Sequence, residues 1–401
     1  MVPEGWAYHA LGDLAQVQRG KFSARPRNDP RFFGGEYPFV QTGDVTRSEI
    51  YLSGHSQTLN EEGLAVSKMF PKNTILMTIA ANIGDVAITT YPVACPDSLV
   101  GINVAVDKAD PNWLILRLQL EQGQLDRNAP KMAQKNINLE VLRPLQLLTP
   151  PLSEQRKIAD ILSTWDRAIE TSEALLATAR TQKRALMQSL LTGKRRFPEF
   201  EGQDWKEVRL GDVFDRVRRK NTVGNENTLT ISGQDGLVSQ QDYFNKRVAA
   251  ADLSGYTLLL GGDFAYNKSY SKGYPMGAIK VLPDGQSGVV SSLYLCFALA
   301  DESLHSRDFF RHFFEFGCFN REIYKIAQEG ARNHGLLNVS VHDFFRLKIS
   351  IPGREEQVRI VDALNVAEDE ETHARKTVDK LRTEKKALMQ QLLTGKRRVV
   401  V

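Results

Sequence analysis

Lys183–Arg196 reads KRALMQSLLTGKRR, and Lys385–Arg398 reads KKALMQQLLTGKRR. The two stretches differ only where Arg184 is replaced by Lys386 and Ser189 by Gln391, and the second begins 202 residues after the first. Identity this dense indicates an internal duplication, and a repeat constrains the fold more strongly than any local propensity. The rest of the chain is therefore organised as two copies of one plan.

The duplication extends to both ends of each copy. Trp6 with Leu11-Gly12-Asp13 recurs as Trp205 with Leu210-Gly211-Asp212, and Asn136–Gln155 is echoed by Asn338–Gln357. Proline near each domain end stops the last strand, and Gly193 and Gly395 are typical helix C-caps. We therefore expect four segments, namely a first domain at 1–151, a helix at 152–196, a second domain at 197–351 and a second helix at 352–401.

Each domain alternates short β-rich runs with glycine and proline, which favours twisted, mostly antiparallel sheet, and Thr42-Gly43-Asp44 is expected to form a turn after one such run. Two longer amphipathic stretches per chain predict intervening helices. We expect two α+β domains of about 150 residues, with strands at 74–79, 84–89, 257–260, 277–281 and 291–299 and helices at 113–122 and 306–328.

The two helical segments are unusually long, about 60 Å for roughly 40 residues. Their inward positions recur at alternating steps of four and three, which is the spacing of a coiled-coil seam. The predicted seam consists of Ile158, Leu162, Trp165, Ile169, Leu176, Leu186 and Leu190 in the first helix and Ile360, Leu364, Val378, Leu381, Leu388 and Leu392 in the second.

Charge along the seam predicts the orientation of the two helices. A parallel pairing would place Lys183 against Lys385, whereas an antiparallel pairing places Arg180 and Lys183 against the acidic run Glu368–Glu371. Such charge patterns set helix orientation. We therefore expect an α+β fold with two globular domains joined by two long antiparallel coiled-coil helices and with internal pseudo-twofold symmetry.

Composition restricts the possible function classes. The net charge is +4, and the excess lies in 152–196, with 9 basic and 5 acidic residues, and in 352–401, with 11 and 9. No apolar run reaches the ~18 residues of a membrane span. The sequence has no phosphate-binding GxxxxGK[ST] loop, no [DNS]PP[YFW] methyltransferase motif and no metal-binding histidine pair. Its three cysteines lack CxxC spacing and fit a reducing, cytoplasmic compartment.

The duplicated motifs resemble one known family. Pro150–Ala159 (PPLSEQRKIA), the heptads and Leu191–Lys194 are similar to the specificity subunit of type I restriction-modification systems. Trp6 with Leu11-Gly12-Asp13, Thr42-Gly43-Asp44-Val45 and Asn136-Ile137-Asn138 resemble the target-recognition domains of that family. The resemblance covers essentially the whole chain. The domain interiors diverge, as at Ala265–Ser269, so the resemblance implies two different half-site sequences.

The resemblance implies a DNA-binding subunit without catalysis of its own. Each domain would read one half of an asymmetric bipartite site on double-stranded DNA, and the helices would fix the spacer and dock two modification subunits. Those partners would methylate adenine with S-adenosylmethionine, and restriction subunits would use ATP and Mg²⁺. We therefore expect no cofactor and no metal on this chain, no membrane association and a prokaryotic cytoplasmic location.

Base edges and phosphates are contacted chiefly by Arg, Lys, Asn and Gln, often with interleaved aromatic residues. Five clusters of such residues lie in predicted loops. The candidate DNA-binding residues are Arg19, Lys21, Arg25, Arg27, Lys131, Gln134, Lys135, Arg216, Arg218, Arg219, Lys220, Tyr266, Asn267, Lys268, Ser269, Lys272, Arg332, Asn333 and His334.

Three alternatives remain open at this point. The basic triplets Lys194–Arg196 and Lys396–Arg398 could contact phosphates, stabilise helix C-termini or dock a partner. The chain could be a two-headed protein-binding scaffold with a coiled-coil spacer. One domain could also hold an enzyme site that no motif reveals.

Overall fold

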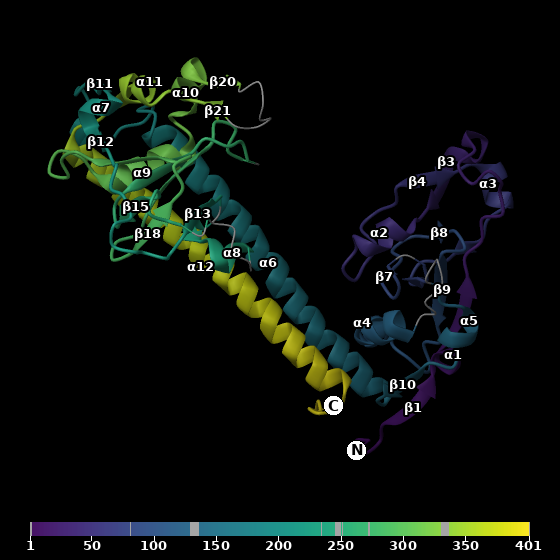
Figure 1. Cartoon of the computed structure of the whole chain (residues 1–401). Coiled ribbons are helices and arrows are strands. Elements are labelled where there is room, and N and C mark those ends of the chain that lie inside the picture. Colours follow the sequence, from purple (N-terminus) through teal and green to yellow (C-terminus); the bar gives the residue numbers. More distant parts are fainter. Residues whose placement is uncertain are drawn as a thin grey trace. The chain divides into compact units, whose positions relative to one another are not determined.

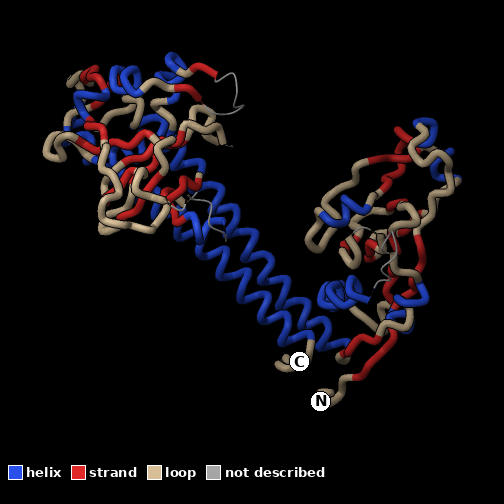
Figure 2. Tube along the Cα trace, in the orientation of Figure 1, coloured by secondary structure: helices blue, strands red, loops and turns tan. Residues whose placement is uncertain are grey.

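The computed structural model describes residues 2–80, 82–128, 136–233, 235–244, 250, 252–271, 273–329 and 337–400. The chain divides into two compact units (Figure 1). Unit 1 comprises Met1–Ser172 with Thr377–Val401, and unit 2 comprises Glu173–Lys376. Each unit therefore contains one domain of strands and short helices together with a segment from each long helix (Figure 2).

The domain of unit 1 contains two four-stranded sheets. The first has the order β2-β9-β6-β7 and is antiparallel throughout, and the second has the order β4-β3-β8-β5 with a parallel contact only between β3 and β8. The strands are β2 (Ala15–Arg19), β3 (Phe33–Phe39), β4 (Gln57–Leu59), β5 (Met69–Phe70), β6 (Ile75–Thr78), β7 (Val86–Ile88), β8 (Val93–Ala94) and β9 (Leu99–Val104).

A two-stranded ribbon of β1 (Ala7–Ala10) and β10 (Gln146–Thr149) leads from this domain into the long helix. The helices of the domain are α1 (Leu11–Leu14), α2 (Thr42–Thr46), α3 (Glu61–Ala65), α4 (Pro111–Asn128) and α5 (Leu139–Leu142), with a 3-10 turn η1 (Pro30–Phe32).

Unit 2 repeats the central sheet with the order β12-β19-β16-β17 and the leading ribbon with β11 and β22. Two further antiparallel pairs are the hairpin β13–β14 and the pair β15–β18, and β20 pairs with β21. The strands are β11 (Lys206–Arg209), β12 (Phe214–Arg216), β13 (Leu229–Ser232), β14 (Gly236–Ser239), β15 (Thr257–Leu260), β16 (Phe264–Asn267), β17 (Ala278–Val281), β18 (Ser287–Val290), β19 (Leu295–Leu299), β20 (Gln328–Glu329), β21 (Leu337–Asn338) and β22 (Lys348–Ile351).

The helices of this domain are α7 (Leu210–Val213), α8 (Gln240–Phe244), α9 (Arg307–Phe316), α10 (Asn320–Ile326) and α11 (Val341–Arg346), with a 3-10 turn η2 (Pro198–Phe200). An aromatic cluster centred on Phe214 fills the core, and its ring lies 4.8 Å from that of Phe310 and 5.1 Å from that of Phe297. Close aromatic packing of this kind holds α9 against the central sheet.

The two long helices are α6 (Leu152–Leu190) and α12 (Arg354–Leu393). They run antiparallel, as predicted. In unit 1 the core joins Ile158 and Leu162 near the start of α6 to Leu392 near the end of α12. In unit 2 it joins Leu190 to Ile360. Every predicted seam residue is buried or half-buried.

Three local expectations require correction. Thr42-Gly43-Asp44 begins the short helix α2 and is not a turn. The helix predicted over 306–328 divides into α9 and α10 because Gly317 adopts a left-handed φ of 82°. The first long helix, expected to run to Thr192-Gly193, already ends at Leu190, although Gly193 (φ 68°) and Gly395 (φ 71°) take the left-handed conformation expected of C-caps. Among the described residues, none of the helices is both long and apolar enough to span a bilayer.

Candidate nucleic-acid interface

The last arginine of each repeated stretch binds a buried glutamate at the start of the other long helix. Arg196 donates from Nε to Glu356 Oε1 at 2.8 Å, and Arg398 donates from Nε to Glu154 Oε2 at 3.0 Å. Glu356 and Glu154 are 2% and 6% exposed. Both ion pairs are bidentate, so Arg196 and Arg398 hold the helix ends together. The side chains of Lys194 and Arg195 are exposed.

The glutamine that follows each of these glutamates anchors its domain to the long helix. Gln155 Oε1 accepts from the Asp110 backbone N–H at 2.8 Å, just before α4. Gln357 Oε1 accepts from the Ser306 N–H at 2.8 Å, just before α9. A buried amide with both ends satisfied orients its neighbours. The duplicated Glu-Gln motif therefore attaches each domain to the long helix that follows it in the sequence.

In unit 1 the structure gathers three predicted arginines after β2. Arg19 Nε donates to the Asp97 carbonyl at 2.6 Å, and Arg27 pairs with the Asp97 carboxylate at 2.8 Å. Arg25 donates to the Ala24 carbonyl at 2.7 Å. Lys21 lies exposed among them. Each guanidinium has five donors, so these contacts hold the arginines in place and leave donors for a further ligand.

Seven of the candidate residues lie outside the described residues. They are Lys131, Gln134, Lys135, Lys272, Arg332, Asn333 and His334. The prediction that they contact DNA stands as a prediction.

The basic cluster after β12 divides into two kinds of side chain. Arg219 forms an ion pair with Asp263, which is 4% exposed, and Lys220 donates to the Gly255 carbonyl at 2.8 Å. Arg216 and Arg218 are exposed, and within the described part of the chain no hydrogen bond or ion pair engages the side chain of either. Arg216 and Arg218 are therefore the members of this cluster best placed to meet a ligand.

The loop predicted around Tyr266 requires one correction. Tyr266 is fully buried, stacks on Phe344 at 5.5 Å and donates its hydroxyl to the Met276 carbonyl at 2.8 Å. It is a core residue and is not available to DNA. Asn267, Lys268 and Ser269 are half-buried, and the Asn267 side chain accepts from the Ser269 N–H at 3.1 Å.

Polar residues of unit 1 that the sequence did not single out also meet on its surface. The buried Asp44 carboxylate accepts from the backbone N–H groups of Gln41 at 2.8 Å and Ser56 at 3.2 Å. This brings the Gln41 amide to 2.9 Å from that of Gln57. Glutamine is a common reader of adenine. Because the two glutamines are 16 residues apart in unrelated elements, no motif could have indicated their pairing.

The comparisons with known proteins agree on one family. Residues 3–179 match the type I restriction modification DNA specificity domain. The chain is 25% identical to the putative type I restriction enzyme MjaX specificity subunit of Methanocaldococcus jannaschii, over 99% of this chain and 95% of the relative. It is 22% identical to the MjaVIII specificity subunit of the same organism, over 99% and 94%.

A solved structure shares the fold. The S subunit of a type I restriction-modification system from M. genitalium superposes with a TM-score of 0.56 at 15% identity, covering 98% of this chain and 96% of that one. The duplicated helix motif, the domain match and the two end-to-end relatives agree. The chain is accordingly similar, from end to end, to specificity subunits of type I restriction-modification systems.

Proposed function

We propose that this chain recognises an asymmetric, bipartite site on double-stranded DNA, with each domain reading one half. The observation that carries the proposal is that two diverged domains are seated by the same residues on duplicated helix segments, through Gln155 in unit 1 and Gln357 in unit 2. Recognition of two different half-sites requires two domains that are attached to the helices in the same way but present different side chains to the DNA.

The side chains available for recognition support this proposal. Unit 1 offers the arginines around Asp97 together with Gln41 and Gln57, and unit 2 offers Arg216 and Arg218. Cationic groups would hold phosphates, and amides would read base edges.

The proposal assigns the chemistry to partner subunits. The long helices fix the distance between half-sites and dock two modification subunits, which methylate adenine with S-adenosylmethionine. Restriction subunits use ATP and Mg²⁺. The exposed faces of α6 and α12 support docking, since Leu175 is 62% exposed and Val366 is 60% exposed on the long helices. The specificity chain itself binds no cofactor and catalyses no step.

The test is selection of bound sequences from a random duplex pool, with the full chain alone and with its modification subunits. The proposal expects two short, different motifs at one fixed spacing. A single contiguous motif, or none in either condition, would contradict it. Absence of DNA selection together with specific capture of two protein partners would favour a protein-binding scaffold, and methyl transfer by the chain alone would favour an enzyme.

A further inference from the structure

Three side chains of unit 2 form a closed network with one backbone carbonyl. Lys280 Nζ donates to the Gly233 carbonyl at 3.0 Å and to Tyr274 Oη at 2.9 Å, and it forms an ion pair with Glu315. Tyr274 Oη lies 2.7 Å from both the Gly233 carbonyl and Glu315 Oε1. The Lys280 ammonium also lies 4.8 Å from the Tyr274 ring centre.

This network is satisfied in full. An ammonium has three N–H donors, and Lys280 uses them on three acceptors while its side chain is only 10% exposed. Burial, followed by the hydrogen bond from its hydroxyl to Glu315, raises the pKa of Tyr274, so the phenol keeps its proton. Removing Lys280 would take a donor from the Gly233 carbonyl and from the half-buried Tyr274 hydroxyl, whereas Glu315, at 40% exposure, could be hydrated.

The network joins two separate surface segments. Gly233 lies in the turn between β13 and β14, and Tyr274 lies in the connection between β16 and β17. The segments are in close contact, since a Cβ added at Gly233 would lie 3.0 Å from the Tyr274 ring. Apart from the network, the β16–β17 connection is held by the Tyr266 hydroxyl on the Met276 carbonyl and by the Leu337 N–H on the Lys268 carbonyl, and neither of these contacts reaches the β13–β14 turn.

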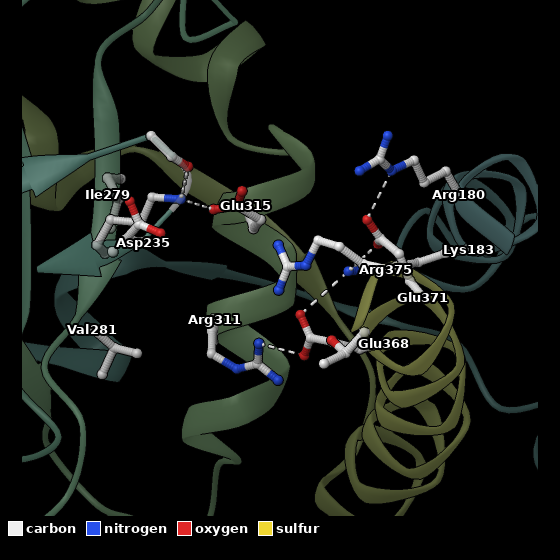
Figure 3. A pocket seen from close by; sticks show the side chains of 14 residues that line it. Arg180, Lys183, Asp235, Ile279, Val281, Arg311, Glu315, Glu368, Glu371 and Arg375 are labelled. Carbon is white, nitrogen blue, oxygen red and sulfur yellow. Dashed lines mark hydrogen bonds and ion pairs between the residues drawn. The ribbon is translucent and has the colours of Figure 1, made fainter. Parts of the chain in front are cut away.

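The other two members stand on rigid elements. Lys280 belongs to β17 in the central sheet, and Glu315 belongs to α9. Helix α9 is anchored by Phe310 and Phe314 in the aromatic core. In Figure 3, Glu315 lies beside Asp235 at the edge of a hollow of about 650 Å³. The network therefore connects a turn and a loop to the central sheet and α9 beside this hollow.

Both fastened segments carry residues suited to nucleic acid. The β16–β17 connection includes the half-buried Lys268 and also Tyr270, which is 63% exposed. The β13–β14 hairpin continues into α8, where Tyr243 is 52% exposed. Lysine and tyrosine side chains are among the groups that contact phosphates and sugars of duplex DNA. Base reading requires such groups to be held within about 0.5 Å of their productive positions.

We propose that Tyr274, Lys280 and Glu315 are positioning residues for sequence specificity: they hold the β16–β17 connection against the β13–β14 turn and thereby fix the half-site preference of unit 2. The inference rests on the proposed recognition of a bipartite DNA site. None of the three residues needs to touch DNA.

The chain offers a matched control. Lys348 also pairs with a glutamate in unit 2, Glu207, at 2.5 Å, but this pair joins β22 to β11 and is exposed on both sides, at 60% and 63%. Lys348→Met therefore removes the same charge and the same type of ion pair without affecting the network.

The experiment uses the full-length chain as wild type and as Lys280→Met, Tyr274→Phe and Lys348→Met. Each is used for selection from a random duplex pool, and each is then tested in competition with duplexes carrying single base-pair changes in either motif. We expect Lys280→Met and Tyr274→Phe to lower discrimination in the same single motif by about tenfold at the affected base pair. The other motif should be unchanged, and Lys348→Met should leave both intact.

The possible outcomes separate the two proposals. If the wild type selects no bipartite site, the proposed function fails before the network is tested, and the inference falls with it. If the wild type selects two motifs and both network variants retain both, the network has no role in specificity. If Lys280→Met loses both motifs in parallel through unfolding, Tyr274→Phe decides, because it removes a single oxygen. Loss of one motif in that variant supports the inference, and any other result overturns it.

Discussion

Arg196 and Arg398 occupy the same position in the repeat, yet their surroundings differ by one hydrogen bond. Glu154, the partner of Arg398, also accepts from Trp6 Nε1 at 3.3 Å. The equivalent Trp205 Nε1 is buried without a hydrogen-bond partner. Glu356 therefore depends on Arg196 to a greater degree than Glu154 depends on Arg398.

This difference predicts unequal effects of the same substitution. Arg196→Ala leaves Glu356 buried without its cation, and breaking a buried pair in this way costs about 3 kcal/mol. Arg398→Ala should cost less, because Trp6 still donates to the Glu154 carboxylate. The Arg398 side chain is also the more exposed of the two, at 41% against 17%.

Amide hydrogen exchange of the full chain measures each effect locally. The peptide at the start of α12 should exchange faster in Arg196→Ala, and the peptide at the start of α6 should exchange faster, by a smaller factor, in Arg398→Ala. Each unit serves as the control for the other. Equal factors, or a larger one for Arg398→Ala, would show that the Trp6 hydrogen bond does not support Glu154.

Tyr266 and Arg219 show which properties of single residues can be predicted from the sequence and which cannot. The alternation of β16 places Phe264 and Tyr266 on one face of the sheet, and that face is the core. The alternation of side chains along a strand could therefore have excluded Tyr266 from the DNA-binding candidates. No pattern could have separated Arg218 from Arg219, because the difference is the ion pair of Arg219 with Asp263, 44 residues away.

At the scale of elements, the long helices were the most predictable part of the molecule. Heptad spacing and charge gave their existence, seam and direction, and the ion pairs formed are those expected from the antiparallel alignment. Lys183 Nζ lies 3.2 Å from Glu368 and 3.1 Å from Glu371, and Arg180 lies 3.2 Å from Glu371. A long periodic pattern averages over many residues, so isolated polar positions do not obscure it.

Short elements were harder to predict because a few contacts decide them. The helix α2 exists where glycine suggested a turn, since the buried Asp44 carboxylate accepts from the Gln41 N–H and from the Ser56 hydroxyl. The Gln41 bond is a local capping contact, whereas the Ser56 bond depends on where the approach to β4 lies in the folded domain. Tertiary contacts of this kind override local turn propensity.

The helix pair of unit 2 should be sensitive to acid. Burial alone would raise the pKa of Glu368, but Arg311 and Lys183 lower it below the ordinary 4.5. Burial is likewise outweighed at Glu371 by Lys183 and Arg180, and its pKa is also lowered. A lowered folded-state pKa gives stability that is complete above pH 4.5 and is lost as the pH falls through the folded-state value.

The expected result is a drop in helix-pair stability as the pH is taken from 5 to about 3, with each carboxylate contributing at most about 1 kcal/mol after solvent screening. Thermal unfolding followed by helix circular dichroism measures it. The double variant Glu368→Gln/Glu371→Gln should be less stable at pH 7 and should show a smaller change over the same pH range. An unchanged pH dependence in the double variant would place the acid sensitivity elsewhere in the chain.

At the scale of the whole molecule, the two compact units do not coincide with the two copies of the repeat. Unit 1 combines Met1–Ser172 with Thr377–Val401, and unit 2 is the continuous segment Glu173–Lys376, which begins within α6 and ends within α12. The repeat predicted four consecutive segments, with the helices as segments of their own. The compact units instead divide each long helix, because antiparallel pairing brings the end of one copy to the beginning of the other.

This exchange of helix ends leads to a prediction about spacing. Removing one heptad from each helix, Ile169–Leu175 together with Lys376–Arg382, preserves the phase of the seam and leaves both seats around Gln155 and Gln357 intact. Seven residues of helix span about 10 Å, or about 3 base pairs at ~3.4 Å each. If the helices set the distance between half-sites, the selected spacer should shorten by about 3 base pairs while both half-site motifs keep their sequences.

Selection from a random duplex pool measures both the spacer length and the half-site sequences. The control is removal of the heptad from α6 alone, which destroys the register of the helix pair. The single deletion should lose the fixed spacing altogether. An unchanged spacer in the double deletion would mean that the helices do not act as the ruler. A change in the half-site sequences would mean that recognition is not confined to the domains, because every residue named in the candidate interface lies outside the deleted segments.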